Sequence, residues 1–433
     1  MPKIRKLSAL VLVSALALSA AGCASGTGGG SSTGGTLTYW SMWKEGEAQQ
    51  KVLASAISDF TMQTGIKVTV QWQGRDSVKK VVPTLNTKNV PDLIDSAFAK
   101  LAPVLATTGQ AKELTAAYGS DVDGKKVSDL IPEAYLADAD ITRKGDKAPW
   151  MLPYTLTSDA FWFNAAAHPE LVSAPPKDWK DFIAELDTLK AANEAPLAID
   201  GDVSGYNAYW YTSALVHIAG PGAMKKIAED KTGKAWEGSD AVEAAKMVQQ
   251  LVEGGYFISG YNASKWPAQQ QSWADNKAAL LYNGTWIPTE TASYAASGFQ
   301  YSSFPFPTVN GGKQVARADF IGFAVPAKAK NAENAQKFAS FFLKKKYQDA
   351  LGTDAKILPI RADATISPEV ASVKKALDSA DGFYVQNDGI TFPGYAEKLL
   401  YPTIDQLVQG KLSAADFIAA MKSGQADYWK QNS

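Results

Sequence analysis

The sequence predicts an α/β protein, and three observations carry that prediction. Short apolar or alternating runs typical of β-strands are separated by stretches with helical spacing. Along the first part of the chain these runs follow the order β-α-β-α-β, which favours a sheet with helical crossovers. Hydrophobic residues make up 46% and charged residues 20% of the sequence, which is typical of globular proteins. Because a chain of 433 residues is too long to fold around one compact core, we expect two domains of ordinary size.

The first five elements follow a Gly/Ser/Thr-rich tract directly. Alternation of apolar and polar residues predicts the strands, and helical spacing places one apolar face on the first helix. Gly65 supplies a common helix stop, and Asp76 can cap the next helix. The expected elements are a strand from Thr36, a helix at 47–64, a strand at 66–72, a helix that carries Val78, Val81, Val82 and Leu85, and a buried strand at 91–94.

The alternation of helices and strands continues through the rest of the chain. Ser413 and Asp416 form a capping-box-like start to the last helix. No repeat with the period of a solenoid is visible. The further expected elements are a helix after Asp178, strands at 196–201, 277–284 and 320–325, and helices at 240–252, at 332–343 and from Ser413.

The N-terminal segment predicts export and a lipid anchor. Three basic residues precede the apolar run 7–22, which suits a signal peptide and is shorter than the about 20 residues of a spanning helix. Residues 18–23 resemble a bacterial lipobox, in which the thiol of Cys23 receives a diacylglyceryl group and becomes the mature N-terminus. The alternative is an ordinary secretory signal with Cys23 as a stray thiol. Residues 24–35 predict a flexible linker.

Charge and residue counts argue against several classes of protein. A formal net charge of -1 gives no reason to expect nucleic acid as a partner. Cys23 is the only cysteine, which excludes an internal disulfide and cysteine-ligated metals. With His168 and His217 as the only histidines, we expect no metal site and no cofactor. The 12 tryptophans exceed what a core ordinarily needs, which favours a stacking surface for a ligand.

Several stretches, in order, resemble the extracellular solute-binding proteins of ABC importers, in the sugar-binding group that includes maltose-binding protein. The chain departs from the family's usual pattern in two places. Lys112–Thr115 stands where the family segment usually contains a proline, and Phe163-Asn164 stands where many members have a tyrosine–asparagine pair. The resemblance covers the chain from Thr36 onward. It is carried by LTYWSMW, ISDFTMQTGIKVTVQW, VPDLIDSAFAKLAPVLATTGQAKELT, MLPYTLTSDAFWFNAAAH, DWKDFIAELDTLKAANEAPLAI, QSWADNKAALLYNGTW and ENAQKFASFFLKKKYQDALG.

The resemblance implies a two-lobe periplasmic-binding-protein fold of the type II kind, with discontinuous lobes joined by hinge strands. A ligand would bind in the cleft between the lobes, which close on it. The family also implies a monomer that works with ABC permease subunits. The expected segments are a signal peptide at 1–22, the lipidated cysteine and linker at 23–35, an N-terminal lobe at 36–148 and 303–355, and a C-terminal lobe at 149–302 and 356–433.

The chemistry of sugars suggests which residues form the site. Sugars present hydroxyl edges and apolar C–H faces, so their sites need aromatic platforms beside planar hydrogen-bonding groups. In open α/β sheets these groups lie beyond the carboxyl ends of strands. Trp40 and Trp43 are the expected first-lobe platform, and Trp286 is the leading candidate. The full expected set is Trp40, Trp43, Arg75, Asp95, Ser96, Tyr154, Asn207, Trp210, Trp286 and Asp319.

Several candidates also have a purely structural interpretation. Either first-lobe tryptophan can pack in a core, and part of the aromatic cluster around Trp210 must do so. Arg75 and Asp95 can serve in a surface salt bridge or a helix cap, and Trp286 can be a packed residue at a strand end. Tyr154 is a candidate because the resemblance places it near the cleft, and Asp319 could reach sugar hydroxyls from the hinge.

The sequence therefore favours a receptor rather than an enzyme. We expect a lipid-anchored protein on the extracellular face of the cytoplasmic membrane, in a Gram-positive envelope, that captures a sugar, in particular an oligosaccharide, and delivers it to the permease. One alternative is an extracellular carbohydrate-active enzyme, which needs two suitably placed carboxylates. Another is the same fold binding a polyol phosphate, for which Arg75 is the obvious cationic group.

Overall fold

The computed structural model describes residues 35–136, 139, 141–142 and 147–432. The expected signal peptide, Cys23 and almost all of the linker lie outside the described residues. None of the helices in the described part of the chain combines the length and the hydropathy that crossing a bilayer requires.

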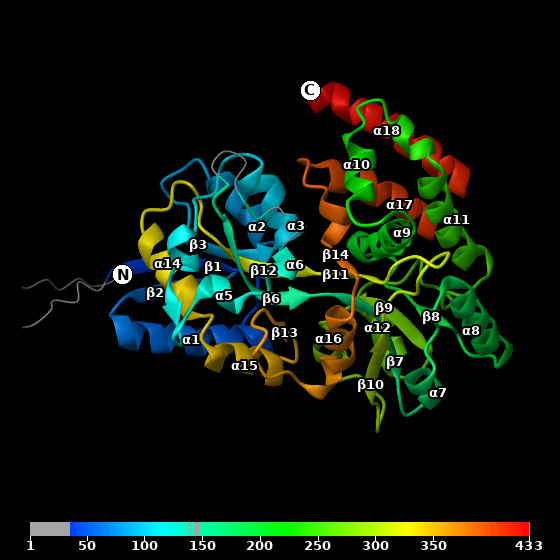
Figure 1. The fold of residues 1–433 in the computed structure, drawn as a ribbon, viewed down its shortest axis with the longest axis horizontal. Helices are drawn as coiled ribbons and strands as arrows, with labels where there is room; N and C mark the ends of the chain where they lie inside the picture. The colour runs from blue at the N-terminus through cyan, green and yellow to red at the C-terminus, as the bar shows by residue number, and fades with distance from the viewer. Residues whose placement is uncertain (1–34, 137–138, 140, 143–146, 433) are drawn as a thin grey trace, which may run out of the picture. The chain divides into compact units, whose positions relative to one another are not determined.

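A six-stranded mixed sheet gathers strands from distant parts of the chain, in the order β13-β6-β12-β3-β1-β2 (Figure 1). Parallel pairs join β1 to β2 and to β3, and β12 runs antiparallel between β3 and β6. Residues 151–157, which the expected division assigns to the second lobe, pair within this sheet. The strands are β1 Thr36–Ser41, β2 Lys67–Trp72, β3 Leu93–Ala97, β6 Met151–Thr157, β12 Asp319–Ala324 and β13 Leu358–Pro359.

A four-stranded sheet has the order β10-β7-β9-β8. Its central strand β7 is antiparallel to β9 and β10, whereas β8 and β9 are parallel. All six residues of β7 and all five of β9 are buried, as expected for strands covered on both faces. The strands are β7 Asp159–Asn164, β8 Leu197–Ala198, β9 Leu280–Gly284 and β10 Tyr301–Phe304.

Three stretches of chain connect the elements of the two sheets. Ser158 alone separates β6 from β7, and Ala318 alone separates β11 (Val315–Arg317) from β12. The third stretch leaves β13 and passes through β14 (Gly382–Tyr384), which pairs in parallel with β11. A short hairpin of β4 (Asp121–Val122) and β5 (Lys125–Lys126) lies outside both large sheets.

Helices flank both sheets, and their ends follow the local sequence signals. Gly65 adopts φ 72°, which an L-residue rarely does, and its N–H caps α1 by donating to the carbonyl of Thr61. Asp178 caps α8 by accepting from the N–H of Asp181. Ser413 and Asp416 form the expected capping box at the last helix. Asp76 precedes α2 as expected, but its carboxylate pairs with Lys79 instead of capping the helix.

The helices with α-helical geometry are α1 Ala48–Thr64, α2 Ser77–Val81, α3 Phe98–Leu101, α4 Thr115–Tyr118, α5 Val127–Leu130, α6 Glu133–Leu136, α7 Pro169–Ser173, α8 Trp179–Ala191, α9 Ser204–Ala219, α10 Ala223–Glu229, α11 Ser239–Glu253, α12 Ala268–Ala274, α13 Ile287–Thr291, α14 Ala332–Phe341, α15 Lys345–Thr353, α16 Ala371–Asp378, α17 Tyr401–Val408 and α18 Ala414–Asn432.

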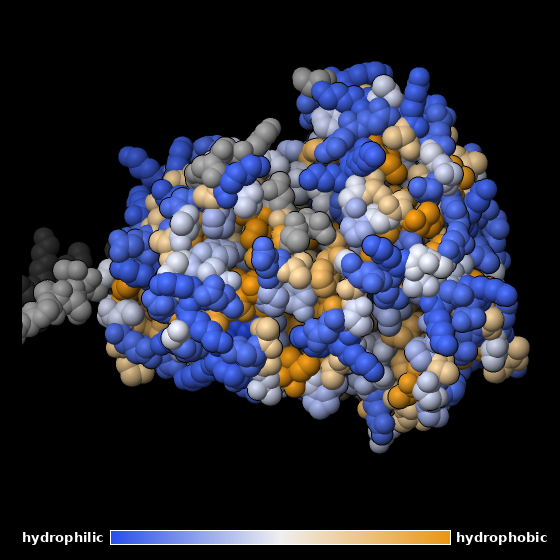
Figure 2. Space-filling model, in the orientation of Figure 1, coloured by the Kyte–Doolittle hydropathy of each residue, from blue (hydrophilic) through white to orange (hydrophobic). Residues whose placement is uncertain are grey.

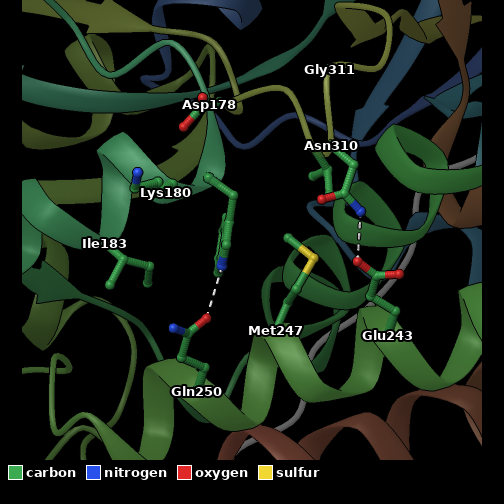
Figure 3. Close-up of a pocket in the computed structure, with 10 residues that line it drawn as sticks. Asp178, Lys180, Ile183, Glu243, Met247, Gln250, Asn310 and Gly311 are labelled. Carbon is green, nitrogen blue, oxygen red and sulfur yellow. Dashed lines mark hydrogen bonds between the residues drawn. The ribbon is translucent and has the colours of Figure 1, made fainter.

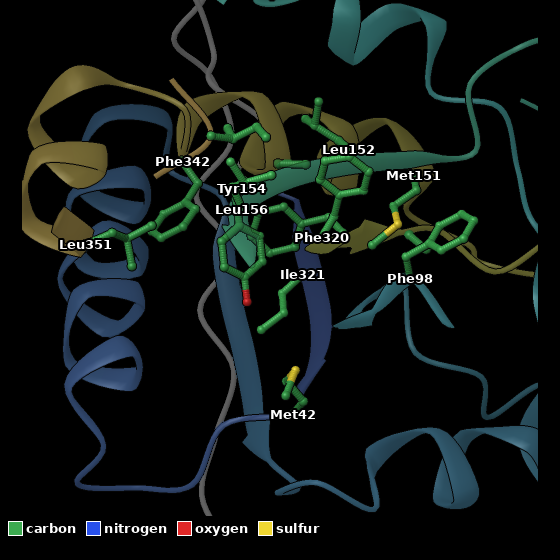
Figure 4. Packing of buried hydrophobic residues seen from close by; sticks show 14 of the residues in the cluster. Met42, Phe98, Met151, Leu152, Tyr154, Leu156, Phe320, Ile321, Phe342 and Leu351 are labelled. Carbon is green, nitrogen blue, oxygen red and sulfur yellow. The ribbon is translucent and has the colours of Figure 1, made fainter. Parts of the chain in front are cut away.

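Two large hydrophobic cores form, one with each large sheet. The first core, around the six-stranded sheet, includes Tyr154 and Phe323, and the second core, around the four-stranded sheet, includes Phe161 and Trp210. Figure 4 shows Tyr154 of the first core among aliphatic and aromatic side chains from several strands and helices. The face shown in Figure 2 is mostly hydrophilic, with hydrophobic residues in small patches.

Candidate functional site

One edge of the six-stranded sheet, at the carboxyl ends of its parallel strands, lies where the chain passes from β6 to β7. Strands β1, β2 and β3 are parallel, and β12 begins at Asp319 opposite Thr157, the last residue of β6. Since Ile321 of β12 also faces Ala97, the last residue of β3, the carboxyl ends of β1, β2 and β3 share the edge that contains Ser158. This is the edge at which open α/β sheets bind ligands.

The four-stranded sheet presents a matching edge to the same point. Asp159 begins β7 and pairs with Gly284, which ends β9. The N–H of Thr285 donates to the carbonyl of Ser158 at 3.0 Å. Because β8 and β9 are parallel, the residues that follow them, Asp200 and Trp286, belong to this edge as well.

Trp286 forms an aromatic platform at this edge. Its half-buried ring stacks on Tyr206, with ring centroids 5.7 Å apart and planes 25° apart. A Cβ at Gly284 would lie 2.2 Å from the indole, so only glycine lets the ring fold back over the end of β9. The ring packs against both cores, and its Nε1–H is buried without a hydrogen-bond partner among the described residues. An unpaired indole N–H beside a stacked aromatic pair is suited to a polar ligand with an apolar face.

Asp200 is a buried carboxylate two residues after β8, with 1% of its surface exposed. Neither of its oxygens has a hydrogen bond of good geometry to a described residue. The backbone N–H groups of Gln269 and Gln270, at the start of α12, lie close enough to favour the anion, but burial outweighs them and raises the pKa of Asp200 to about 7. The side-chain Oε1 atoms of both glutamines are also buried, and no residue that the structure describes bonds to them.

Glu290 connects this group to the six-stranded sheet. It lies one helical turn after Trp286 and accepts a hydrogen bond from Gln270 Nε2 at 3.3 Å. Burial raises the pKa of Glu290, while that hydrogen bond and the positive charge of Arg75 oppose the shift. Arg75 follows β2, so charged groups from the edges of both sheets act on one another here.

Arg75 and Trp43 form the corresponding group at the edge of the six-stranded sheet. The guanidinium lies 4.7 Å from the centre of the Trp43 ring, in a cation–π arrangement. Arg75 Nη1 also donates to the carbonyl of Met42 at 3.0 Å and to Glu47 Oε2 at 2.9 Å. Trp43 is 5% exposed, whereas Trp40 is half-buried on β1 against the first core.

The structure places Asp95 and Tyr154 in a closed hydrogen-bond network inside the first core. Asp95 Oδ2 accepts from the hydroxyls of Tyr39 at 2.8 Å and Tyr154 at 2.7 Å, and Oδ1 accepts from the N–H of Met42 at 2.7 Å. Burial raises the pKa of Asp95, and these donors stabilise its charged form. Trp43 Nε1 donates to the Tyr154 hydroxyl at 2.8 Å, so the network holds the turn after β1.

Four other predicted residues are also buried. Ser96 is fully buried, with no hydrogen bond to its Oγ from a described residue. Asn207 Nδ2 donates to the carbonyl of Gly201 and to Asp405. Trp210 packs edge to face against three aromatic rings of the second core. Asp319 lies 3.4 Å from Arg317 Nη1 in an ion-pair cluster at the crossing strands.

The structure thus brings Trp43 and Arg75 to one sheet edge and Trp286 to the other. Their predicted role as ligand contacts stays a prediction, as it does for the remaining seven residues. Sequence reasoning missed five members of the group, which are Asp200, Tyr206, Gln269, Gln270 and Glu290. A partial signal exists for Asp200, because it is an acidic residue near the end of the expected strand 196–201, and Asp95 likewise follows the expected strand 91–94.

A surface pocket of about 370 Å³ lies apart from these edges, between α8, α11 and the turn at 309–311 (Figure 3). Its polar groups bond to one another, as in the 2.9 Å bond from Trp179 Nε1 to Gln250 and the 2.8 Å bond from Asn310 to Glu243. No predicted site residue lines it. Within the described residues, no cluster of His, Cys, Asp and Glu could hold a metal ion.

Comparison with known proteins defines the family. The model of the bacterial extracellular solute-binding protein family matches residues 55–377. A probable sugar-binding periplasmic protein of Mesorhizobium japonicum is 24% identical over 59% of this chain, and the match spans 62% of that protein, less than two thirds of its length. A multiple sugar-binding protein of Streptococcus mutans is 22% identical over 76% of each chain.

The fold is shared with solved structures. A chitin oligosaccharide binding protein superposes with a TM-score of 0.76 at 19% identity, over 92% of this chain and 99% of that chain. The predicted α/β class and two-lobe fold are confirmed. Because the family model covers most of the chain, the protein belongs to the bacterial extracellular solute-binding protein family.

Proposed function

We propose that the protein is the substrate-binding receptor of an ABC importer and that it captures a sugar between the two sheet edges. The observation that carries the proposal is the stacked Trp286–Tyr206 pair beside buried polar atoms that lack a partner in the described part of the chain, above all the carboxylate of Asp200. The aromatic faces suit the C–H faces of a sugar, and the unpartnered atoms suit its hydroxyls. The relatives named as sugar-binding proteins support the same ligand class.

The ligand we propose is an oligosaccharide. Aromatic side chains lie at both edges, with Trp43 and Trp40 from β1 and its following turn, and Trp286 with Tyr206 opposite. A ligand of several sugar rings can contact both groups at once. The structural relative that binds chitin oligosaccharides agrees with this size of ligand.

We propose that the two lobes correspond to the two sheets and close on the sugar by bending at the crossing strands. Ser158 and Ala318 are single residues between strands of different sheets, so they are natural bending points. This refines the predicted division, because the lobe change shifts from 148/149 to Ser158. The second lobe then takes β7 to β10, and the last helices, which contribute to the second core, return to it.

Outside the described residues, we propose that Cys23 is lipidated and that the Gly/Ser-rich tract is a tether. A diacyl group supplies two chains, enough for stable attachment where one chain is marginal. The receptor would then remain at the extracellular face of a Gram-positive membrane as a monomer, near its permease. A Cys23→Ser variant should appear in the medium with unchanged sugar binding, and retention of that variant at the membrane would contradict the anchor.

Titration calorimetry of the chain from Thr36 tests the ligand class. The panel contains stachyose, maltotriose, a chitin trisaccharide and glucose, and at least one neutral sugar should bind with saturation. Trp286→Ala should weaken that binding, whereas Trp179→Ala, in the surface pocket, serves as the matched tryptophan control and should leave it unchanged. Failure of every sugar to bind, or cleavage of any of them, contradicts the receptor proposal.

A further inference from the structure

Asp200 differs from the other fully buried carboxylates near the sheet edges. Asp95 is bonded through both oxygens within the first core, and Asp319 accepts from the N–H of Phe320 beside Arg317. Asp200 is as deeply buried, at 1% exposure, but neither oxygen makes a hydrogen bond of good geometry to a described residue. A buried charge without donors is costly, and native structures retain such groups chiefly where another molecule supplies the donors.

The strongest charges acting on Asp200 are negative. Asp202, on the same loop, and Glu290, on α13, both raise its pKa. Tyr206, on α9, is also coupled to Asp200, and its neutral phenol carries no charge that could balance the carboxylate. The carboxylate of Asp202 already has partners, because it accepts a hydrogen bond from the N–H of Trp266 at 2.9 Å and lies 3.7 Å from Lys265 Nζ.

The remaining unpartnered groups around Asp200 are mainly acceptors. Gln270 donates its Nε2 to Glu290, which fixes the amide so that its Oε1 stays free as an acceptor. Gln269 Oε1 is a second buried oxygen that has no partner among the described residues, and Trp286 Nε1 is the unpartnered donor. A molecule that satisfies this set must therefore bring more donors than acceptors.

We propose that Asp200, with Gln269 and Gln270, forms an acceptor subsite that binds a pair of adjacent hydroxyl groups at one end of a neutral sugar and rejects anionic sugar esters. This inference rests on the proposed function, because it places the sugar beside Trp286. Two adjacent hydroxyls can donate to the two carboxylate oxygens at once, in charge-assisted hydrogen bonds. A phosphate group would bring negative charge and acceptors toward Asp200 and Glu290, which disfavours the polyol phosphate alternative.

Binding through Asp200 should be linked to a proton. Burial holds the pKa of Asp200 near 7 in the free protein, and hydroxyl donors favour the anion and lower that pKa. Sugar binding should therefore release protons near neutral pH. If the bound carboxylate is ionised throughout, affinity should rise about tenfold from pH 6 to pH 8, because the ionised fraction of the free protein rises by that factor.

The experiment compares wild type, Asp200→Asn and the matched control Asp202→Asn with the neutral sugar from the panel that binds best. Asp200→Asn should weaken binding by roughly 10- to 100-fold, as expected for lost charge-assisted bonds. It should also abolish the dependence on pH and the proton release, which calorimetry in buffers of different ionisation enthalpy measures. Asp202→Asn should retain sugar binding and still release protons, with the release moved to lower pH, because the negative charge of Asp202 raises the pKa of Asp200.

Glucose 6-phosphate should bind no more than weakly to the wild type. The inference is overturned if a sugar binds but Asp200→Asn retains its affinity, if wild-type binding releases no proton, or if the phosphate ester binds as tightly as the neutral sugar. Proton release by the wild type still tests the inference if the variant does not fold. The failure of all sugars to bind would instead contradict the proposed function itself.

Discussion

Arg317 should be essential for stability, because it holds two buried carboxylates where the chain crosses between the sheets. Its side chain is 2% exposed, and Nε lies 2.7 Å from Asp159 and Nη1 3.4 Å from Asp319, whose side chains are 5% and 2% exposed. The guanidinium also lies 4.5 Å from the centre of the Tyr209 ring. Arg317→Met keeps most of the apolar stem but leaves both carboxylates without their cation.

Removing one partner of a buried ion pair costs about 3–5 kcal/mol, and two carboxylates here share the same partner. We therefore expect Arg317→Met to lower the free energy of unfolding at pH 8 by at least about 3 kcal/mol. Burial already raises the pKa of Asp319 while Arg317 opposes the shift, so the variant should raise that pKa further. An acid whose pKa is higher in the folded than in the unfolded protein destabilises the fold, and the full effect is present above the folded-state pKa. As the pH falls below the folded-state pKa, the loss of stability in Arg317→Met should therefore shrink by about 1.4 kcal/mol per pH unit.

Urea unfolding at pH 8 and pH 5, followed by fluorescence and circular dichroism, measures both effects. Arg361→Met is the matched control, because Arg361 is also 2% exposed but its partners Asp123 and Asp363 are 37% and 45% exposed. Water can solvate those carboxylates, so the control should lose about 1 kcal/mol. Equal losses in the two variants, or a loss for Arg317→Met that does not change with pH, would refute the reasoning.

Two further predictions concern packing and pH. In Gly284→Ala, the new methyl group would lie 2.2 Å from the Trp286 ring, so the ring must move. Sugar binding should weaken, and the free energy of unfolding should fall by about 1–3 kcal/mol. Unchanged binding in calorimetry would show that Trp286 is not part of the site. Burial lowers the pKa of His217 to about 4, so the unfolded chain takes up a proton there first, and stability should fall by about 3 kcal/mol between pH 6.5 and pH 4. His217→Phe should remove that part of the pH dependence in unfolding curves, and an unaltered pH profile would contradict the assignment.

Local signals in the sequence predicted the elements well. The helix expected at 47–64 is observed as α1 at Ala48–Thr64, and it ends at Gly65 because of the left-handed conformation there. The strand expected at 196–201 is shorter, since β8 contains only Leu197 and Ala198. The chain turns at Asp200, whose backbone carbonyl accepts from the N–H of Val203, and thereby leaves the sheet.

The candidate site was less predictable, because it depends on partners far away in the chain. Asp95 and Asp200 look alike in sequence, as acidic residues at the ends of apolar runs. Only the fold shows that Tyr39 and Tyr154 bond to Asp95, whereas no described residue donates a hydrogen bond of good geometry to Asp200. Such contacts depend on the pairing of strands that lie far apart in the sequence, so they cannot be predicted from residue spacing along the chain.

A crystal structure with the best-binding neutral sugar tests the central claim most directly. We predict a sugar ring stacked on Trp286, with two of its hydroxyls at hydrogen-bond distance from the carboxylate of Asp200. Contacts from Trp43 or Arg75 should reach the same molecule from the opposite sheet edge. A sugar bound instead in the pocket beside Trp179, with the Trp286 edge empty, would contradict the account.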